Sequence, residues 1–216
     1  MTDVSREQVD RFVEACRDVA RRGLVHCSCG NLSMRVDKER FLITSTGSWM
    51  ERMTAEQASV CATRDGVMLG GKKPSSEIGL HAGILRARPE LNVVLHFQTP
   101  CATALACRKP DGLDYAVIPE IPYYIGSVGR VPYYTPGTDE LAEAVTEAMR
   151  AHDMVLMTNH GQVTAGRDYD QVVQNAEFFE LACQILLIGG DAVAPMSGLA
   201  ADALRALRTK GAKRAC

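Results

Sequence analysis

Two hairpin signals, set among segments with helical periodicity, constrain the fold of this chain most. Residues 32–36 and 40–44 are largely apolar runs that flank the turn-forming pair Asp37-Lys38, and a second hairpin is indicated around residues 64–66. Hairpins join antiparallel strands, so these signals disfavour a sheet in which every strand is parallel. The pattern therefore predicts an α/β fold in which helices pack on the faces of a mostly antiparallel sheet.

Further helices and strands are indicated along the rest of the chain. Ser5 and Gln8 have capping-box spacing and begin a helix that ends near Gly23. The apolar periodicity predicts helices over residues 76–87, 99–107, 138–151, 169–188 and 199–207, and buried strands over 92–98 and 154–158. Residues 115–134 are broken by prolines and glycines and predict brief strands separated by turns.

Length and composition favour one domain of ordinary globular character. The 216 residues favour a single domain over 1–216, and a net charge of −2 gives no basic excess for binding nucleic acid. No window approaches the roughly 18 apolar residues of a membrane-spanning helix, so no membrane partner is expected. The amino terminus lacks a signal peptide and the eight cysteines are scattered, which indicates reduced thiols and a cytoplasmic protein. The basic C-terminal end, from about residue 205, is expected to be solvated and frayed.

The predicted strand 92–98 becomes polar on one face toward its end. Alternation places Val94, His96 and Gln98 on one face and apolar residues on the other. An imidazole nitrogen and an amide oxygen on the same face can both bind a metal ion. The same pair is also explained by two hydrogen-bonded polar residues at a strand end.

A second histidine and a carboxylate are also candidates for a site. His160 lies in the turn 158–161 directly after a buried strand, a place where functional and ordinary surface histidines both occur. Glu77 lies in the first turn of the predicted helix 76–87, where a carboxylate complements the helix dipole. His81 follows four residues later, in position to hydrogen-bond Glu77.

Three short segments have the composition of anion-binding loops. Residues 28–31, 44–47 and 75–76 are small and polar, and the last pair opens a helix with free N–H groups. Each segment by itself is equally a turn or a helix cap. Neither GxGxxG nor a P-loop occurs, so a nucleotide cofactor has no support.

Seven motifs occur in a specific order along residues 5 to 190. They are CSCGNLSMR (27–35), LITSTG (42–47), KPSSEIGLH (73–81), NVVLHFQ (92–98), IPEIPYY (118–124), YYTPGT (133–138) and TNHG (158–161). In this order they resemble the class II aldolase/adducin family, and within it the small bacterial sugar-phosphate aldolases of the L-fuculose-1-phosphate aldolase type. The resemblance implies a three-layer α/β/α sandwich around a mostly antiparallel sheet. It also implies a homotetramer with a divalent metal ion, usually zinc, near the subunit interface.

The resemblance assigns site residues motif by motif. The metal set falls on Glu77, His96 and His160, while the second histidine of the family's HxH motif is replaced here by Gln98. An amide oxygen is a harder ligand than imidazole, so manganese or magnesium becomes an alternative to zinc. The phosphate-binding set falls on Ser28, Asn31, Thr46, Gly47, Ser75 and Ser76. A catalytic tyrosine from a neighbouring subunit falls on Tyr123, with Tyr124 as the alternative in alignment.

The implied activity is reversible retro-aldol cleavage of a ketose 1-phosphate to dihydroxyacetone phosphate and an aldehyde. In the synthesis direction Glu77 would remove the C3 proton and Tyr123 would give a proton to the aldehyde oxygen. A C-terminal tyrosine that contributes to fuculose-phosphate aldolases has no counterpart after Tyr169, so fuculose itself is not supported. A sugar-phosphate 4-epimerase and a dehydratase are alternatives on the same scaffold. An adducin-like binding module without catalysis is the alternative of a different class.

Overall fold

A computed structural model describes residues 4–109 and 112–214. Eight strands are distributed along the chain: β1 (Asn31–Arg35), β2 (Arg40–Thr44), β3 (Ala58–Ala62), β4 (Met68–Gly70), β5 (Val93–Phe97), β6 (Val128–Val131), β7 (Met154–Met157) and β8 (Gly161–Gly166). The α-helices are α1 (Arg6–Arg21), α2 (Ile78–Ala87), α3 (Pro100–Ala106), α4 (Asp139–Ala148), α5 (Tyr169–Gly189) and α6 (Gly198–Arg214). Four short helical turns complete the described part: η1 (Met50–Arg52), η2 (Ala55–Gln57), η3 (Ile121–Ile125) and η4 (Gly190–Ala192).

The strands form one mixed sheet in the order β4-β3-β2-β1-β5-β8-β7-β6. Every neighbouring pair is antiparallel except β6 and β7, which run parallel. At the centre, β5 lies between β1 and β8, so His96 is opposite Asn31 on one side and Val163 on the other. The expected mostly antiparallel sheet, including the hairpin of β1 and β2, is confirmed.

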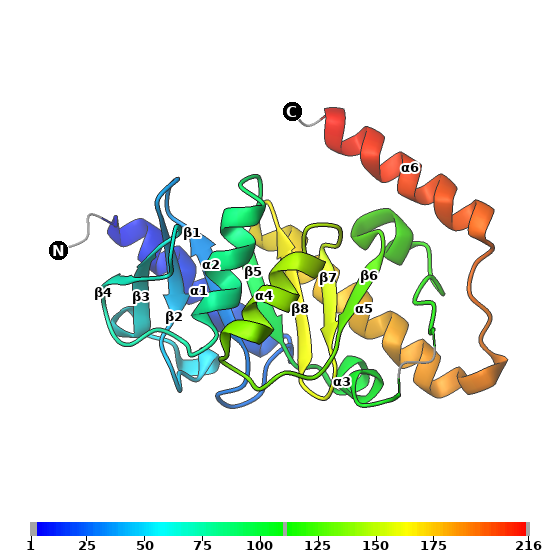
Figure 1. Cartoon of the computed structure of the whole chain (residues 1–216), viewed down its shortest axis with the longest axis horizontal. Helices are drawn as coiled ribbons and strands as arrows, with labels where there is room; N and C mark the ends of the chain where they lie inside the picture. Colours follow the sequence, from blue (N-terminus) through cyan, green and yellow to red (C-terminus); the bar gives the residue numbers. More distant parts are fainter. Residues whose placement is uncertain (1–3, 110–111, 215–216) are drawn as a thin grey trace.

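Helices cover both faces of the sheet, as Figure 1 shows with α2 and α4 in front and α1 and α5 behind. Two separate apolar clusters correspond to these faces. In β5, Leu95 and Phe97 belong to the cluster under α1, α3 and α5, whereas Val94 belongs to the cluster under α2 and α4. This alternation directs the side chain of His96 to the face that carries α2.

Strand β8 was not predicted from the sequence, although it lies beside the central strand. The segment GQVTAG begins and ends with glycine, and its only apolar side chains are those of Val163 and Ala165. All six residues are nevertheless buried, because β5 and β7 pair with the two edges of the strand. Tertiary pairing therefore outweighs a local sequence that is typical of a turn.

Residues 115–134 differ from the expected succession of brief strands. Only β6 is a named strand there, and Ile121–Ile125 forms a single π-helical turn with Pro122 at its start. Proline is tolerated in the first turn of a helix, because the N–H group that it lacks would have no acceptor within the helix there. The turn also contacts α6, and this contact joins segments far apart in the sequence.

The basic C-terminal segment, from about residue 205, belongs to helix α6, which extends as far as Arg214. That its end frays stays a prediction. The Arg208 guanidinium donates to the backbone oxygen of Tyr124 at 3.1 Å and forms an ion pair with Asp153. These contacts attach α6 beside η3, although Figure 1 shows most of the helix standing away from the sheet. Asp153 is buried and also pairs with Arg88, so the attachment reaches the body of the protein.

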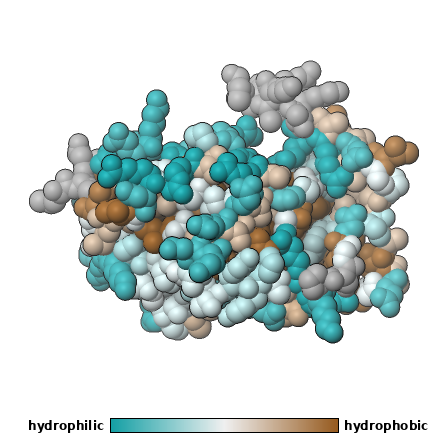
Figure 2. Space-filling model, viewed as in Figure 1, coloured by the Kyte–Doolittle hydropathy of each residue, from teal (hydrophilic) through white to brown (hydrophobic). Residues whose placement is uncertain are grey.

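Apolar residues also occur on the surface and in one long helix. Val67, Met68 and Leu69 are exposed at the edge strand β4, and Figure 2 shows hydrophobic atoms at that end, as it does in other parts of this face. The segment 169–192, which contains α5, is long and apolar enough to cross a membrane by length and composition alone. Here α5 packs against α3, β5 and β8, as a core helix does.

Candidate functional site

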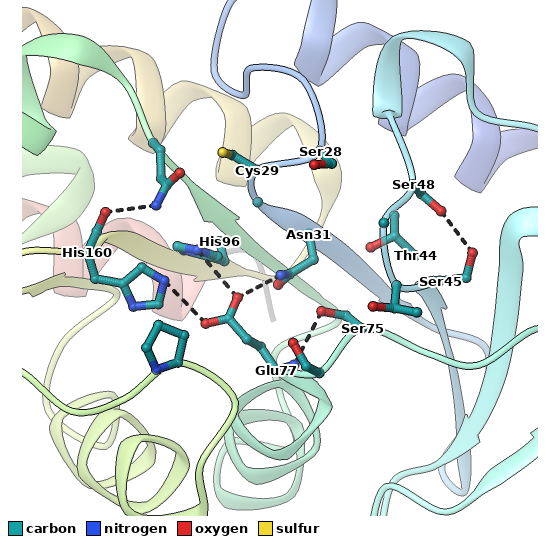
Figure 3. A pocket seen from close by; sticks show the side chains of 16 residues that line it. Ser28, Cys29, Asn31, Thr44, Ser45, Ser48, Ser75, Glu77, His96 and His160 are labelled. Carbon is teal, nitrogen blue, oxygen red and sulfur yellow. Dashed lines mark hydrogen bonds and ion pairs between the residues drawn. The ribbon is translucent and has the colours of Figure 1, made fainter.

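One cavity of about 320 Å³ brings together residues from six separate segments (Figure 3). The segments are the loop before β1, the loop after β2, the start of α2, the end of β5, the loop between β6 and α4 with Pro136, and the turn between β7 and β8. All the predicted metal and phosphate residues line it: Ser28, Asn31, Thr46, Gly47, Ser75, Ser76, Glu77, His96, Gln98 and His160. The tyrosine predicted to act in catalysis, Tyr123, is not among the lining residues.

Glu77, His96 and His160 form a compact cluster at one end of this cavity. Glu77 Oε2 lies 3.4 Å from His96 Nε2, and Glu77 Oε1 lies 3.4 Å from His160 Nε2. One ligand atom from each residue lies within 4.8 Å of the other two. The side chains are 8%, 2% and 10% exposed, respectively, so water competes little with an ion at this point.

The hydrogen bonds around the cluster leave lone pairs that face one another. His96 Nδ1 lies 2.9 Å from the carbonyl oxygen of Gln162, which can only accept, so Nδ1 carries the proton and Nε2 is the nitrogen available to a metal. Glu77 Oε1 is buried and has no hydrogen-bond partner within the described chain. A buried carboxylate oxygen beside imidazole nitrogens is satisfied by a shared cation.

The spacing also fits a small divalent ion. Ligand atoms about 2.0–2.1 Å from a tetrahedral zinc ion are about 3.3 Å apart. Each imidazole nitrogen lies 3.4 Å from one of the two carboxylate oxygens, His96 from Oε2 and His160 from Oε1. The residues present therefore fit a metal ion held by one carboxylate and two imidazoles.

The pKa values of the cluster also suit a metal ligand set. Burial, with a smaller effect of His96 in the same direction, lowers the pKa of His160 to about 4, although Glu77 opposes the shift. His160 is therefore neutral near pH 7 and can bind an ion. Burial alone raises the pKa of Glu77, but His96, the hydrogen bond from Asn31 and His160 together outweigh it, and the pKa is lower than usual.

Gln98 lies beside the cluster but is bound at one end. Its Nε2 donates to the backbone oxygen of His160 at 2.8 Å, which leaves Oε1 as the only atom of the amide able to bind an ion. Gly161 permits this approach, because a Cβ there would lie 2.7 Å from Gln98 Cγ and 3.0 Å from His96 Cε1. Glycine at 161 is therefore needed for the turn to close over the end of β5.

The other end of the cavity is composed of small hydroxyl residues and backbone groups. The N–H of Ser75 donates to Thr44 and that of Thr46 donates to Lys73, so the loop after β2 is tied to the segment before α2. The N–H groups of Gly47 and Ser76 have no partner among the described residues. Free N–H groups and hydroxyls are suited to a phosphate group. Among the described residues that line the cavity there is no Lys or Arg.

Asn31 and His81 differ from their predicted contacts. Both ends of the Asn31 amide are engaged inside the protein: Nδ2 donates to Glu77 Oε2 at 2.8 Å, and Oδ1 lies 2.5 Å from His81 Nε2. The sequence predicts a hydrogen bond from His81 to Glu77. In the structure His81 bonds to Asn31 instead. The assignment of the Asn31 side chain to phosphate stays a prediction, and it requires the amide to leave these partners.

Tyr123 lies on η3 and is 37% exposed. Its ring meets that of Tyr124 edge to face, and Tyr124 stacks on Phe178. Because Tyr123 points to the surface outside the cavity, it could act in this site only from another subunit. The assignment of Tyr123 over Tyr124 stays a prediction.

Two residues that support the site were not predicted from the sequence. Gln162 orients His96 through its backbone oxygen, and Ser33 binds His81 at 2.7 Å. Gln162 lies in the strand that was not predicted. Ser33 could have been found, because alternation in 31–35 places Asn31, Ser33 and Arg35 on one polar face of a strand.

Fold and site together define an α/β protein with a candidate metal centre at one end of a cavity whose other end is lined by small hydroxyl residues and glycine. Residues 10–187 match the Class II Aldolase and Adducin N-terminal domain. A 3-oxo-tetronate 4-phosphate decarboxylase of Haemophilus influenzae is 36% identical over 183 residues, which are 83% of this chain and 86% of that protein. An L-fuculose phosphate aldolase of Escherichia coli is 31% identical over 182 residues, 82% of this chain and 81% of that protein.

A solved structure is similar over nearly the whole chain. The crystal structure of YgbL from Escherichia coli aligns with a TM-score of 0.85 and 28% identity, and covers 92% of this chain and 98% of that chain. The chain therefore belongs to the class II aldolase and adducin family. The family is metal-dependent, and Glu77, His96 and His160 are a possible metal site in this member.

Proposed function

We propose that this protein is a metal-dependent carbon–carbon lyase that decarboxylates a phosphorylated 3-oxo sugar acid such as 3-oxo-tetronate 4-phosphate. One observation carries the proposal: the cluster of Glu77, His96 and His160 and a phosphate-sized set of neutral donors line the same cavity. The decarboxylase similarity over 83% of the chain supports this choice of reaction.

The reaction produces charge that such a site can stabilise. Cleavage of the C1–C2 bond releases CO₂ and leaves its electron pair as an enediolate over C2, C3 and the C3 oxygen. Addition of a proton at C2 then gives dihydroxyacetone phosphate. A divalent ion held by Glu77, His96 and His160, with Gln98 Oε1 nearby, would supply Lewis-acid stabilisation of the oxygens that become negative.

The residues of the chain have separate tasks in this reaction. Ser75, Ser76, Thr46 and Gly47 hold the phosphate through hydroxyl and N–H donors and so orient the reacting carbons. Glu77 would deliver the proton to C2 through the carboxylate oxygen that does not bind the ion. The burial of the cluster keeps bulk water away from the carbanion.

The absence of Lys and Arg from the described residues that line the cavity favours decarboxylation in particular. A carboxylate loses its charge as it leaves as CO₂, so a Lys or Arg beside it would stabilise the ground state more than the transition state. The cavity has no such residue among those that line it. CO₂ also leaves without a proton, so this half of the reaction needs no acid group such as Tyr123.

Retro-aldol cleavage of a ketose 1-phosphate is the second candidate. Breaking the C3–C4 bond of such a sugar yields the same enediolate of dihydroxyacetone phosphate, with an aldehyde in place of CO₂. The similarity to an L-fuculose phosphate aldolase favours it. In this case Tyr123 of a neighbouring subunit in a homotetramer would donate or accept the proton of the aldehyde oxygen.

A 4-epimerase, a dehydratase and a non-catalytic binding module have less support. The two enzymes could use the same cluster, but neither has a specific observation in its favour. An adducin-like binding module has no need for an intact cluster, whereas Glu77, His96 and His160 are held at ligand spacing. Zinc is the metal we propose first, with manganese or magnesium as alternatives because of Gln98.

The test compares two substrates on one protein. The metal-loaded enzyme is incubated with 3-oxo-tetronate 4-phosphate or with a panel of ketose 1-phosphates, and dihydroxyacetone phosphate is measured in each reaction. We expect the first substrate to give dihydroxyacetone phosphate and CO₂ in equal amounts. An aldehyde from the second group in its place would support the aldolase. Metal-loaded protein that acts on neither would contradict both lyase activities.

A further inference from the structure

The polar face of β1 lies against the inner face of α2, and every second residue of the strand contacts every fourth residue along the helix. Three contacts join them: Asn31 to Glu77 at 2.8 Å, Ser33 to His81 at 2.7 Å, and Arg35 to the backbone oxygen of Leu85 at 2.7 Å. Two residues along a strand and four along a helix both advance by about 6–7 Å. The three contacts therefore fix the start of α2, and with it Glu77, relative to β1.

The contacts of Asn31 with Glu77 and of Ser33 with His81 belong to a buried series of hydrogen bonds. Ser33 and His81 are 0% exposed and Asn31 is 5% exposed. His81 uses both ring nitrogens, Nδ1 toward Ser33 Oγ and Nε2 toward Asn31 Oδ1. Because no water reaches these groups, each depends on the next one for its hydrogen bond.

The hydrogen bonds from Ser33 to Glu77 all run in one direction from donor to acceptor. The Glu77 carboxylate accepts, so the Asn31 amide presents its NH₂ group to Glu77 and its oxygen to His81. His81 must therefore donate from Nε2 and accept at Nδ1 from the Ser33 hydroxyl. A neutral ring can do both at once, and burial keeps the ring neutral by lowering its pKa to about 3.

This series of hydrogen bonds ends at Glu77, and its last bond determines which carboxylate oxygen of Glu77 is available. Asn31 occupies Oε2, whereas Oε1 faces His160 without a hydrogen-bond partner within the described chain. If the amide of Asn31 turned over, its oxygen would face the carboxylate and repel it. His81 stabilises the observed orientation, because in the matching tautomer its Nε2 proton is donated to Asn31 Oδ1 while Nδ1 accepts from Ser33.

We propose that His81 is a positioning residue for the metal centre: through Asn31 it fixes the Glu77 carboxylate with Oε1 directed to His160 and the cavity. The proposal rests on the proposed metal-dependent function, since it concerns the geometry of a metal ligand. Figure 3 shows Asn31 and Glu77 directed toward each other beside His96.

The test uses two substitutions that differ in hydrogen bonding. In His81→Gln the new amide oxygen can accept from Ser33 and the new NH₂ group can donate to Asn31, whereas His81→Leu removes both bonds. Cobalt affinity of the substrate-free protein is measured by equilibrium dialysis, with circular dichroism to show that each variant is folded. We expect His81→Leu to bind cobalt about 10–100-fold more weakly than wild type, and His81→Gln to retain most of the affinity.

Three results would overturn the positioning role. The first is wild-type cobalt affinity in folded His81→Leu, and the second is an equal loss in folded His81→Gln and His81→Leu, which would indicate packing alone. If His81→Leu does not fold, Asn31→Ala removes the direct contact with Glu77 and leaves α2 intact, and wild-type affinity in that variant is the third. Wild-type protein that binds no cobalt would instead overturn the metal site itself, and the role of His81 with it.

Discussion

Gln98 donates from Nε2 to the backbone oxygen of His160 across 2.8 Å, and so connects the end of β5 to the turn that carries a candidate metal ligand. Gln98 stands where the family's HxH motif has its second histidine, and its amide holds His160 in place. Its remaining polar atom, Oε1, is a weaker zinc ligand than an imidazole nitrogen. Gln98 would therefore influence the proposed metal site in two ways, by positioning the His160 turn and by offering Oε1 to an ion.

Replacing Gln98 by histidine should strengthen zinc binding. An added imidazole supplies a third nitrogen ligand, and we expect zinc affinity to rise by about tenfold or more, with a smaller change for manganese. Competition with a chromophoric chelator measures both affinities. Gln98→Leu, which lacks any ligand atom, is the matched control. Unchanged zinc affinity in Gln98→His would show that residue 98 does not contact the ion.

Replacing Glu77 by glutamine should remove both metal and activity. The substitution keeps the shape of the side chain but removes its charge, and an amide is a poor substitute for a carboxylate in holding a divalent ion. We expect at least a 100-fold loss of lyase activity together with substoichiometric metal after dialysis. Glu143→Gln on the exposed face of α4 is the control. Full activity in Glu77→Gln would exclude Glu77 from the reaction.

Replacing Ser76 by alanine should weaken phosphate recognition. Ser76 is exposed in the cavity next to the start of α2, and its hydroxyl can donate to a phosphate oxygen. We expect KM for the phosphorylated substrate to rise about tenfold, in line with a lost hydrogen bond to a charged group. Binding of dihydroxyacetone phosphate and of dihydroxyacetone is compared by calorimetry. Equal losses for the two ligands would remove Ser76 from the phosphate site.

Replacing Tyr123 by phenylalanine should separate the two lyase reactions. Only the aldol reaction transfers a proton to or from an aldehyde oxygen, so we expect aldol cleavage to fall by about 100-fold and decarboxylation to fall less. The ratio of the two rates is the measurement, and Tyr124→Phe is the control for the adjacent ring.

Mixing inactive Glu77→Gln and Tyr123→Phe subunits tests whether Tyr123 acts across an interface. We expect part of the aldol activity to return after the subunits have exchanged. A monomeric mass in light scattering, or no recovery in demonstrated hybrids, would contradict a shared site.

Without metal, stability should fall as the solution becomes acidic. Burial lowers the pKa of His81 to about 3 in the folded protein, while in the unfolded chain it returns to about 6.5. The unfolded state therefore takes up a proton first, and stability present above pH 6.5 is lost progressively as the pH falls toward 3. By pH 5 this residue alone should cost about 2 kcal/mol.

Denaturant unfolding in the presence of a chelator, at pH 7.5 and pH 5, measures this loss. His81→Gln cannot titrate and should have a smaller difference between the two pH values, whereas His26→Gln, at an exposed position, should match wild type. An identical pH dependence in wild type and His81→Gln would show that His81 contributes nothing to it.

The sequence predicted the parts of the site that depend on local pattern. His96 and Gln98 followed from alternation within a strand, and His160 and the serines at 75 and 76 from their places in a turn and at a helix start. Strand β8 and the bond from Ser33 to His81 could not be predicted, since each depends on elements far apart in the sequence coming together. Glu77 lies just before α2 as its N-cap, and not within the first turn, because the helix begins at Ile78.

The metal cluster draws each of its three ligands from a different element, and Asn31 comes from a fourth. No short segment of the unfolded chain can therefore assemble the site, and loop closure between distant strands has to come first. Metal should thus bind after the rate-limiting step of folding. Zinc would then leave the refolding rate unchanged and slow unfolding, so that the ion prolongs the life of the native state without helping to form it.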